Sequence, residues 1–168
     1  VLQGKLIWSS IWMMIALFSA PFLIQAKSQW YPFPVEVSTT GPIPTSEKMV
    51  INYVPLEKAR RRWSLCAFFP HMKDSYWLAV NFGLAREVER LGVQMRLYQA
   101  GGYDNLPTQI EQIKECTAQG ADGVIIGAIS YHGLDSLVDK LHEQGVPVVD
   151  LVNGMSSEKG LARSLVSF

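Results

Sequence analysis

The sequence has no excess of charge of either sign, because 15 lysines and arginines balance 15 aspartates and glutamates. A neutral chain offers no broad electrostatic field to nucleic acid or to an anionic surface. Charged residues are also few, at 18% against 48% apolar residues, which is typical of a folded domain and not of a disordered chain. The 168 residues suffice for one domain with a core and are too few for two full ones.

Groups that carry chemistry are scarce as well. The three histidines, His71, His132 and His142, lack the spacing of metal ligands, and no aspartate has a histidine and a serine arranged for nucleophilic attack. The glycine pair at 101–102 lacks the remaining residues of a phosphate-binding loop. We therefore expect no catalytic residue, no metal and no cofactor, and a binding protein rather than an enzyme.

Only two cysteines are present, Cys66 and Cys116, and neither their spacing nor their neighbours indicate a metal site or a catalytic thiol. Cys66 falls in a predicted first strand and Cys116 near the end of a predicted second helix. In a doubly wound sheet that helix crosses back over the first strand, so a disulfide can form in an oxidising compartment. Two free buried thiols are the alternative.

The first 26 residues have the pattern of a secretory signal peptide. Lys5 precedes an apolar run over residues 6–23, and a small residue, Ala26, closes the segment. Serines and Pro21 within the run favour a removable segment over a membrane-spanning helix. The pattern therefore predicts export, and an uncleaved membrane anchor is the alternative.

The next stretch, residues 27–62, is rich in proline, serine and threonine. This composition predicts an extended N-terminal arm with at most a short strand at 35–37. The basic run at 58–62 is interpreted as a solvated entry to the first strand of the domain.

Residues 63–168 alternate strands and helices. Short apolar runs predict strands buried on both faces, and apolar residues at helical spacing predict the helices between them. The expected strands span 64–69, 93–98, 122–128 and 146–152, and the expected helices span 75–91, 106–119 and 134–144. With right-handed crossovers, this order gives an α/β fold, a doubly wound parallel sheet in a three-layer α/β/α lobe.

The chain ends on a further expected strand at 164–168, with no helix after it. A sheet that stops on an uncovered strand indicates an incomplete domain, so we expect a truncated protein whose second lobe is absent. The expected organisation is a signal peptide at 1–26, an arm at 27–62 and a first ligand-binding lobe at 63–168.

Fold class also indicates where to look for function, because ligands of such sheets bind at the carboxyl ends of the strands, near the reversal of strand order. Three segments follow these ends, at 70–77, 100–105 and 129–132. We expect His71, in the first of them, to be a solvated loop residue, and a histidine that lines the site is the alternative.

The same segments hold one carboxylate and three aromatic side chains, Asp74, Tyr76, Trp77 and Tyr103. Aromatic faces attract a quaternary ammonium group, and a carboxylate adds complementary charge. The set therefore predicts a site for a small cationic or methylated head group. The alternative is that Tyr76 and Trp77 are the first core residues of their helix.

Three runs, at 65–67, 73–77 and 100–103, resemble the TorT-like, trimethylamine N-oxide-sensing members of the type I periplasmic binding protein family. The run Lys-Asp-Ser-Tyr-Trp at 73–77 is the distinctive one. The resemblance covers residues 63–153 and implies the first of two lobes. It also implies a periplasmic protein that signals to a sensor histidine kinase and thereby regulates trimethylamine N-oxide respiration.

The resemblance further implies an aromatic box with an acidic residue beside it, which holds the trimethyl head group between two lobes. Asp74, Tyr76, Trp77 and Tyr103 match the positions of the first lobe, and the remaining walls belong to sequence downstream of this chain. A ribose- or galactose-like sugar-binding protein of an ABC transporter is the alternative, because Asp74 and Asn105 suit sugar hydroxyls. An exported flavodoxin-like enzyme is a third class, for which the sequence has no motif.

Overall fold

The computed structural model describes residues 32–38, 48–157 and 161–164. The predicted signal peptide at 1–26 lies outside these ranges, as do parts of the predicted arm. None of the helices in the described ranges has both the length and the hydrophobicity needed to cross a membrane.

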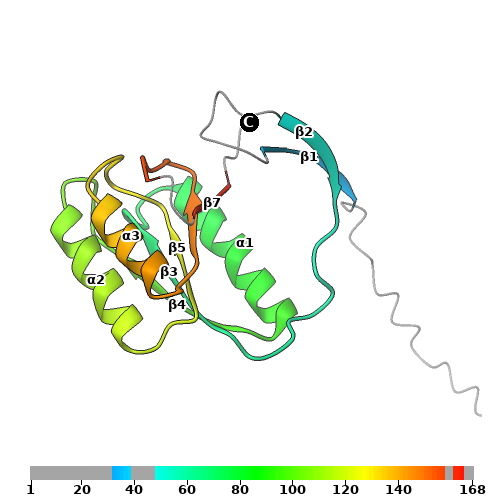
Figure 1. Ribbon diagram of the computed structural model, residues 1–168, viewed down its shortest axis with the longest axis horizontal. Helices are drawn as coiled ribbons and strands as arrows, with labels where there is room; N and C mark the ends of the chain where they lie inside the picture. Colours follow the sequence, from blue (N-terminus) through cyan, green and yellow to red (C-terminus); the bar gives the residue numbers. More distant parts are fainter. Residues whose placement is uncertain (1–31, 39–47, 158–160, 165–168) are drawn as a thin grey trace, which may run out of the picture. The chain divides into compact units, whose positions relative to one another are not determined.

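The described residues form two sheets and three helices, coloured along the chain in Figure 1. The strands are β1 (Phe33–Ser38), β2 (Lys48–Tyr53), β3 (Ser64–Phe69), β4 (Gln94–Gln99), β5 (Gly123–Ile126), β6 (Val148–Leu151) and β7 (Leu161–Ser164). The helices are α1 (Ser75–Leu91), α2 (Leu106–Ala118) and α3 (Asp135–Glu143).

The larger sheet has the strand order β4-β3-β5-β6-β7, and all of its strand pairs are parallel. The chain steps outward from β3 to β4, crosses back over β3 to β5, and then continues in that direction. This reversal is the doubly wound pattern and confirms the predicted fold class. β1 and β2 form a separate antiparallel hairpin, paired from Phe33↔Tyr53 to Ser38↔Lys48.

α1 covers one face of the larger sheet, and α2 and α3 cover the other (Figure 1). Alternate residues of β3 show this division. Cys66 and Phe68 belong to the core beneath α2 and α3, whereas Ala67 and Phe69 belong to the core beneath α1. Successive side chains of a strand point to opposite faces, so this one strand contributes fully buried residues to both cores.

The helix and strand bounds follow the predictions closely. α1 begins and ends where expected, because Asp74 caps its first turn and Gly92, with φ 68°, ends it in the left-handed conformation. The bounds of α2, α3 and β4 to β6 lie within two residues of the expected ones. Local signals, namely caps, glycines and apolar periodicity, therefore suffice for these elements.

Two strands differ from the predictions. The arm contains β2 in addition to the expected strand at 35–37, because β1 pairs with this second strand in a hairpin. The last strand is β7, which lies three residues before the expected 164–168, and residues 165–168 lie outside the described ranges. Parallel pairing with β6, which aligns Val148 with Leu161, sets this register, whereas the apolar residues further on suggested a later start.

A disulfide joins Cys66 of β3 to Cys116 of α2. Because α2 crosses back over β3, the two Cα atoms lie 6.7 Å apart, a distance that a disulfide can span. Both side chains are completely buried in the core beneath α2. The bond links residues 50 apart in the sequence. It joins β3, the first strand of the lobe, to α2, the helix that crosses back over this strand.

An ion pair lies at the amino edge of the larger sheet, where β3 and β5 begin. One oxygen of Asp122 accepts a hydrogen bond from the backbone N–H of Ser64 at 2.8 Å, and the other lies 2.7 Å from the guanidinium of Arg61. Arg61 also stacks on the ring of Trp63. The Ser64 N–H and then the Arg61 guanidinium hold the pKa of the Asp122 carboxyl below its ordinary value.

We expect the variant Asp122→Asn to melt at a lower temperature than the wild type at neutral pH. A carboxyl whose pKa is lowered on folding stabilises the folded state above the unfolded-chain pKa of about 4, and this contribution is lost as pH falls through the folded-state pKa. The difference between the two melting temperatures should therefore narrow in acid. Thermal unfolding across the pH range measures it, and a constant difference would show that the charge of Asp122 is irrelevant.

Candidate functional site

The carboxyl ends of the strands meet where strand order reverses, between β3 and β5. Residues 70–74 connect β3 to α1, residues 100–105 connect β4 to α2, and residues 127–134 connect β5 to α3. In α/β sheets the loops diverge at such a reversal and leave a crevice that binds ligands. The four residues predicted from the sequence lie in the first two loops or at the start of α1, so the sheet gathers them at one edge.

Asp74 is the N-cap of α1. Its Oδ1 accepts a hydrogen bond from the backbone N–H of Trp77 at 2.9 Å, which satisfies one of the free donors of the first turn. Its Oδ2 faces Nε2 of His71 at 3.7 Å, and the side chain is 50% exposed. The cap therefore fixes the carboxylate in position while leaving it open to a bound molecule.

Trp77 is packed in the core beneath α1. Its side chain is 2% exposed, and its ring centroid lies 4.8 Å from that of Phe69. Gly127 also lies against the indole, so closely that a Cβ there would be 2.4 Å from Cη2 of Trp77. Of the two interpretations that the sequence leaves open, core packing describes most of this side chain. Its Nε1 still reaches the site, because it donates to the hydroxyl of Tyr103 at 3.3 Å.

The two tyrosines are more accessible than Trp77. Tyr76 is partly buried and packs edge-on against Trp77, with ring centroids 5.6 Å apart. Tyr103 is 48% exposed and follows a tight turn in which Gly101 has φ 91°. The structure thus brings Asp74, Trp77 and Tyr103 into one hydrogen-bonded group, and Tyr76 joins it through the ring of Trp77.

His71 is not a solvated loop residue, contrary to the prediction. Its side chain is only 14% exposed, and its ring meets Tyr103 edge-on with centroids 5.4 Å apart. Its Nδ1 accepts from the backbone N–H of Lys73 at 3.3 Å, so the proton of the neutral ring resides on Nε2, which faces Asp74. His71 therefore lies between the carboxylate and the tyrosine, a tertiary contact for which the sequence carries no local signal.

Asn153, which follows β6, is a site residue that the sequence analysis misses. Its Nδ2 donates to the carbonyl of Ala128 at 2.8 Å and to the hydroxyl of Tyr103 at 3.4 Å. The preceding residue, Val152, has φ 73°, a conformation rare for a β-branched side chain and common near ligand sites. The rule that ligands bind at carboxyl ends points to Asn153 once it is applied to the fourth strand as well.

Gln109 of α2 holds the loop after β5 in place. It is completely buried, donates to the carbonyl of Gly127 at 3.0 Å, and accepts from the backbone N–H of Ile129 at 3.1 Å. A buried amide with both ends bonded positions a loop better than an apolar residue, because an alternative loop conformation would leave it unpaired.

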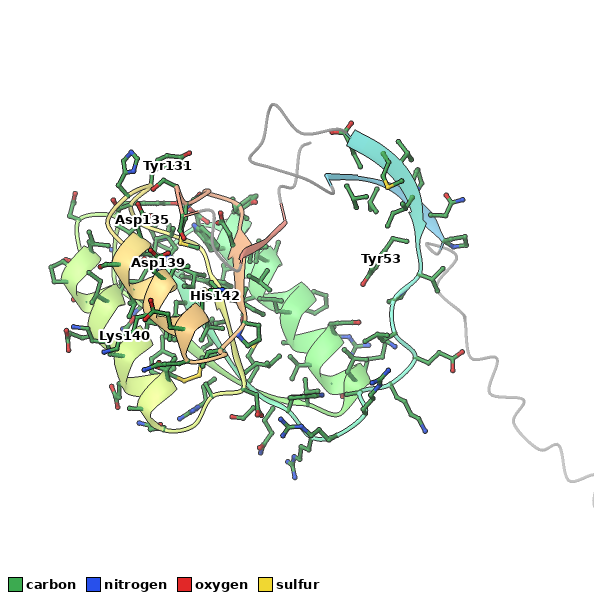
Figure 2. All side chains as sticks on the ribbon, viewed as in Figure 1. Tyr53, Tyr131, Asp135, Asp139, Lys140 and His142 are labelled. Carbon is green, nitrogen blue, oxygen red and sulfur yellow. A yellow bond between two sulfur atoms is a disulfide. The ribbon has the colours of Figure 1, made fainter. Side chains whose placement is uncertain are left out.

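A clasp made by His132, Asp135 and Ser156 joins the same loop to the segment after β6. The Ser156 hydroxyl lies 2.8 Å from Nδ1 of His132 and donates to Asp135. Figure 2 shows Asp135 near Tyr131 at one end of α3. This is the first residue of the helix, and it lies at the carboxyl edge of the sheet. In a nucleophilic triad the histidine lies between serine and carboxylate, whereas here the serine lies in the middle. The clasp therefore acts structurally and holds the segment that carries Asn153.

Asp74 and Tyr103 are both about half exposed at the carboxyl edge. Two shallow hollows of the described surface lie at the opposite, amino edge, one lined by His142, Gly145, Val146 and Pro147 and the other by Ser64, Gln94, Met95, Arg96 and Gln119. Within the described ranges, no group of three histidine, cysteine or acidic side chains is close enough to hold a metal ion. The carboxyl edge offers a carboxylate, a phenol hydroxyl and ring faces, which suit non-covalent binding of a small molecule.

Comparison with known proteins gives one family and several relatives. Residues 67–167 match the periplasmic binding protein domain family. The chain is 39% identical over 108 residues to periplasmic protein TorT of Escherichia coli (strain K12), a match that covers 63% of this chain and 30% of that protein. This match confirms the resemblance read from the sequence.

Solved structures give the same result. The chain is similar to an ABC transporter solute binding protein from Bradyrhizobium sp. BTAi1 with bound Bis-Tris, with a TM-score of 0.79, 48% identity, and coverage of 83% of this chain and 42% of that one. It is also similar to a chain of the TorS sensor domain–TorT complex in the presence of trimethylamine N-oxide, with a TM-score of 0.53, 38% identity, and coverage of 57% and 32%. The chain thus spans less than half the length of these relatives.

Proposed function

This chain belongs to the periplasmic binding protein family, and on that premise we propose that it forms one lobe of a periplasmic receptor for a small methylated amine. The proposed ligand is trimethylamine N-oxide or a close relative. The observation that carries the proposal is the connected group of Asp74, Tyr76, Trp77 and Tyr103 at the carboxyl edge. The similarity to the TorS sensor domain–TorT complex solved in the presence of trimethylamine N-oxide supports the same class of ligand.

Each residue of the group has a proposed role. The half-exposed carboxylate of Asp74 attracts the positive end of the ligand, and the rings of Tyr76 and Tyr103 contact its methyl groups. A ring contact of this kind contributes about 0.5–2 kcal/mol, depending on how far the site excludes water. Trp77, which is almost completely buried, forms the wall behind them and fixes Tyr103 through its indole N–H.

A second lobe supplies the remaining contacts in this proposal, because a ligand on this lobe alone would stay exposed to solvent. A ligand that bridges two lobes shifts the population toward the closed state by its differential affinity for that state. The periplasmic domain of a sensor histidine kinase then recognises one of the two states and regulates trimethylamine N-oxide respiration. The relative solved with the TorS sensor domain supports a partner of this kind.

Transport is the second candidate function. The observation in its favour is the 48% identity to an ABC transporter solute binding protein. Bis-Tris, bound in that relative, is an amine with several hydroxyl groups and fits an amine or a polyol site. A sugar ligand would need hydroxyl partners such as Asn105, one of whose two Nδ2 hydrogens already bonds to the carbonyl of Ala100 at 2.9 Å.

Calorimetry on the full-length protein distinguishes the candidates. We expect it to bind trimethylamine N-oxide and not to bind ribose or galactose. Binding of a sugar without binding of the amine oxide would overturn the proposal in favour of sugar transport. Ligand-dependent association with the sensor domain of the cognate kinase, measured by light scattering, then tests the signalling role separately from ligand binding.

The variant Asp74→Asn tests the role of the carboxylate. We expect it to weaken binding of trimethylamine N-oxide about tenfold or more, because a polar contact with a charged group is worth about 1.5–3 kcal/mol. Asparagine is as good an N-cap as aspartate, so the melting temperature without ligand should not change. Unchanged affinity would show that Asp74 only caps the helix.

A further inference from the structure

The β1–β2 hairpin has one apolar face. Residues directly opposite in an antiparallel pair share a face, and neighbours along each strand alternate between the two faces. The register aligns Val35 with Ile51, and these positions and their alternate neighbours form one face, which holds Val35, Val37, Met49, Ile51 and Tyr53. The opposite face is mixed and holds Pro34, Glu36, Val50 and Asn52.

This apolar face is open to solvent. Met49, Ile51 and Tyr53 are 51%, 38% and 43% exposed, respectively. Within the described ranges, the two cores of the lobe include no residue of the hairpin. A two-stranded hairpin is at best marginally stable in water unless its apolar face packs against another element. The face is therefore a surface built for contact.

The first lobe holds the hairpin at one end. Arg90, in the last turn of α1, donates to the backbone carbonyl of Leu56 at 2.7 Å and to that of Glu57 at 3.2 Å. These carbonyls lie just after β2, which ends at Tyr53. The hairpin is thus anchored at the amino edge of the larger sheet, where α1 ends.

The hairpin is long enough to reach the other edge. From Leu56 back to Lys48, an extended chain covers about 26 Å, and the 17 residues of α1 cover about 25 Å. α1 runs from the carboxyl edge, at Asp74, to the amino edge. A hairpin anchored beside Arg90 can therefore extend to the carboxyl edge, where the proposed second lobe faces the first.

One relative matches the arm as well as the lobe. Residues from 63 onward make up less than two thirds of the chain, whereas the match to the ABC transporter solute binding protein covers 83%, so that match extends into the arm. The match to the TorT chain solved with a sensor domain covers 57%, and the lobe alone is large enough to account for it. A surface for a sensor kinase would be expected in the second relative rather than in the first. The occupant of the apolar face is therefore better sought within the protein itself.

We propose that the apolar face of the β1–β2 hairpin packs on the second lobe, so that the hairpin is a strap that links the two lobes. This proposal rests on the two-lobe receptor of the proposed function and does not depend on the ligand. The chain matches only 42% of the length of the solute binding protein, which leaves room for such a lobe. A strap anchored by Arg90 on one lobe and packed on the other biases the equilibrium between open and closed states.

Hydrogen exchange on the full-length protein without ligand tests the strap. We expect the backbone amides of β1 and β2 to exchange slowly in the wild type. The double variant Met49→Gln/Ile51→Thr makes the apolar face polar with little change of shape. It should speed exchange at least about tenfold in the hairpin and in one segment of the second lobe. The matched control is Val50→Thr, which changes the opposite face of the same strand and should leave both regions unchanged.

Three results would overturn the proposal. Fast exchange of the wild-type hairpin would show that nothing covers it. Loss of protection in α1 instead of the second lobe would place the hairpin on its own lobe, and protection that rises with protein concentration would assign the face to a second copy. Unchanged exchange in α2 and β5 excludes global unfolding of the double variant. Because no ligand is present, failure to bind trimethylamine N-oxide would count against the proposed ligand and leave this result standing.

Discussion

Replacing Cys66 and Cys116 together by alanine is expected to lower the free energy of unfolding by about 4 kcal/mol. The disulfide closes a loop between residues 50 apart, and a cross-link of that span removes much of the conformational freedom of the unfolded chain. For a protein of this size the change corresponds to a fall in melting temperature on the order of 10 °C. Urea unfolding of the wild type and the double variant measures the difference directly.

Reduction of the wild type is the matched control, because it opens the same loop without deleting a side-chain atom. We expect a reducing agent to produce most of the loss seen in the double variant and to add nothing when applied to that variant. If the unfolding midpoint of the wild type does not move on reduction, the covalent bond contributes nothing, and any loss in the variant reflects the cavity left by two buried side chains.

Trp77→Ala should have an effect of similar size, about 4 kcal/mol, because deleting a buried aromatic ring removes its packing and leaves a cavity. The indole is 2% exposed and lies between Phe69 and the backbone at Gly127, which has no side chain to fill the space. The variant should melt early without ligand and should also lose ligand binding, since Tyr103 loses one of its two donors. Thermal unfolding with and without trimethylamine N-oxide measures both losses.

Trp77→Phe separates packing from the hydrogen bond. Phenylalanine keeps an aromatic ring against Phe69 but has no N–H for Tyr103, so this variant should retain more stability than Trp77→Ala and still bind the ligand more weakly. A Trp77→Ala protein as stable as the wild type would contradict the core role of this residue and would assign the indole to the ligand alone.

The order of elements in the lobe is predictable because its signals are local. Asp74 caps α1 and Gly92 ends it, and apolar residues recur at helical spacing between them. The same reasoning locates the carboxyl-edge loops, since a doubly wound order follows from alternating strands and helices. The sequence alone leaves open whether Cys66 and Cys116 form a disulfide or stay free thiols, because the pairing depends on which strand α2 crosses.

The contacts within the site are not predictable in the same way. Trp77 and Tyr76 are adjacent in sequence, yet Trp77 is buried against Phe69 and Gly127 and Tyr76 is partly accessible. His71 and Asn153 reach Tyr103 from loops that are distant in sequence, and no periodicity or motif encodes such meetings. Which side chains touch is set by strand order and register, and these emerge only when the sheet is assembled.

The uniform direction of the five strands separates the two edges of the larger sheet. The turns that close α2 and α3, at Gly120 and Gly145, lie at the amino edge, a full strand length from Asp74 and Tyr103, and both glycines are exposed. A fluorophore or a surface-immobilisation tag attached beside either turn would therefore leave the carboxyl edge free. This separation would let such a label report on the whole protein without touching the proposed binding edge.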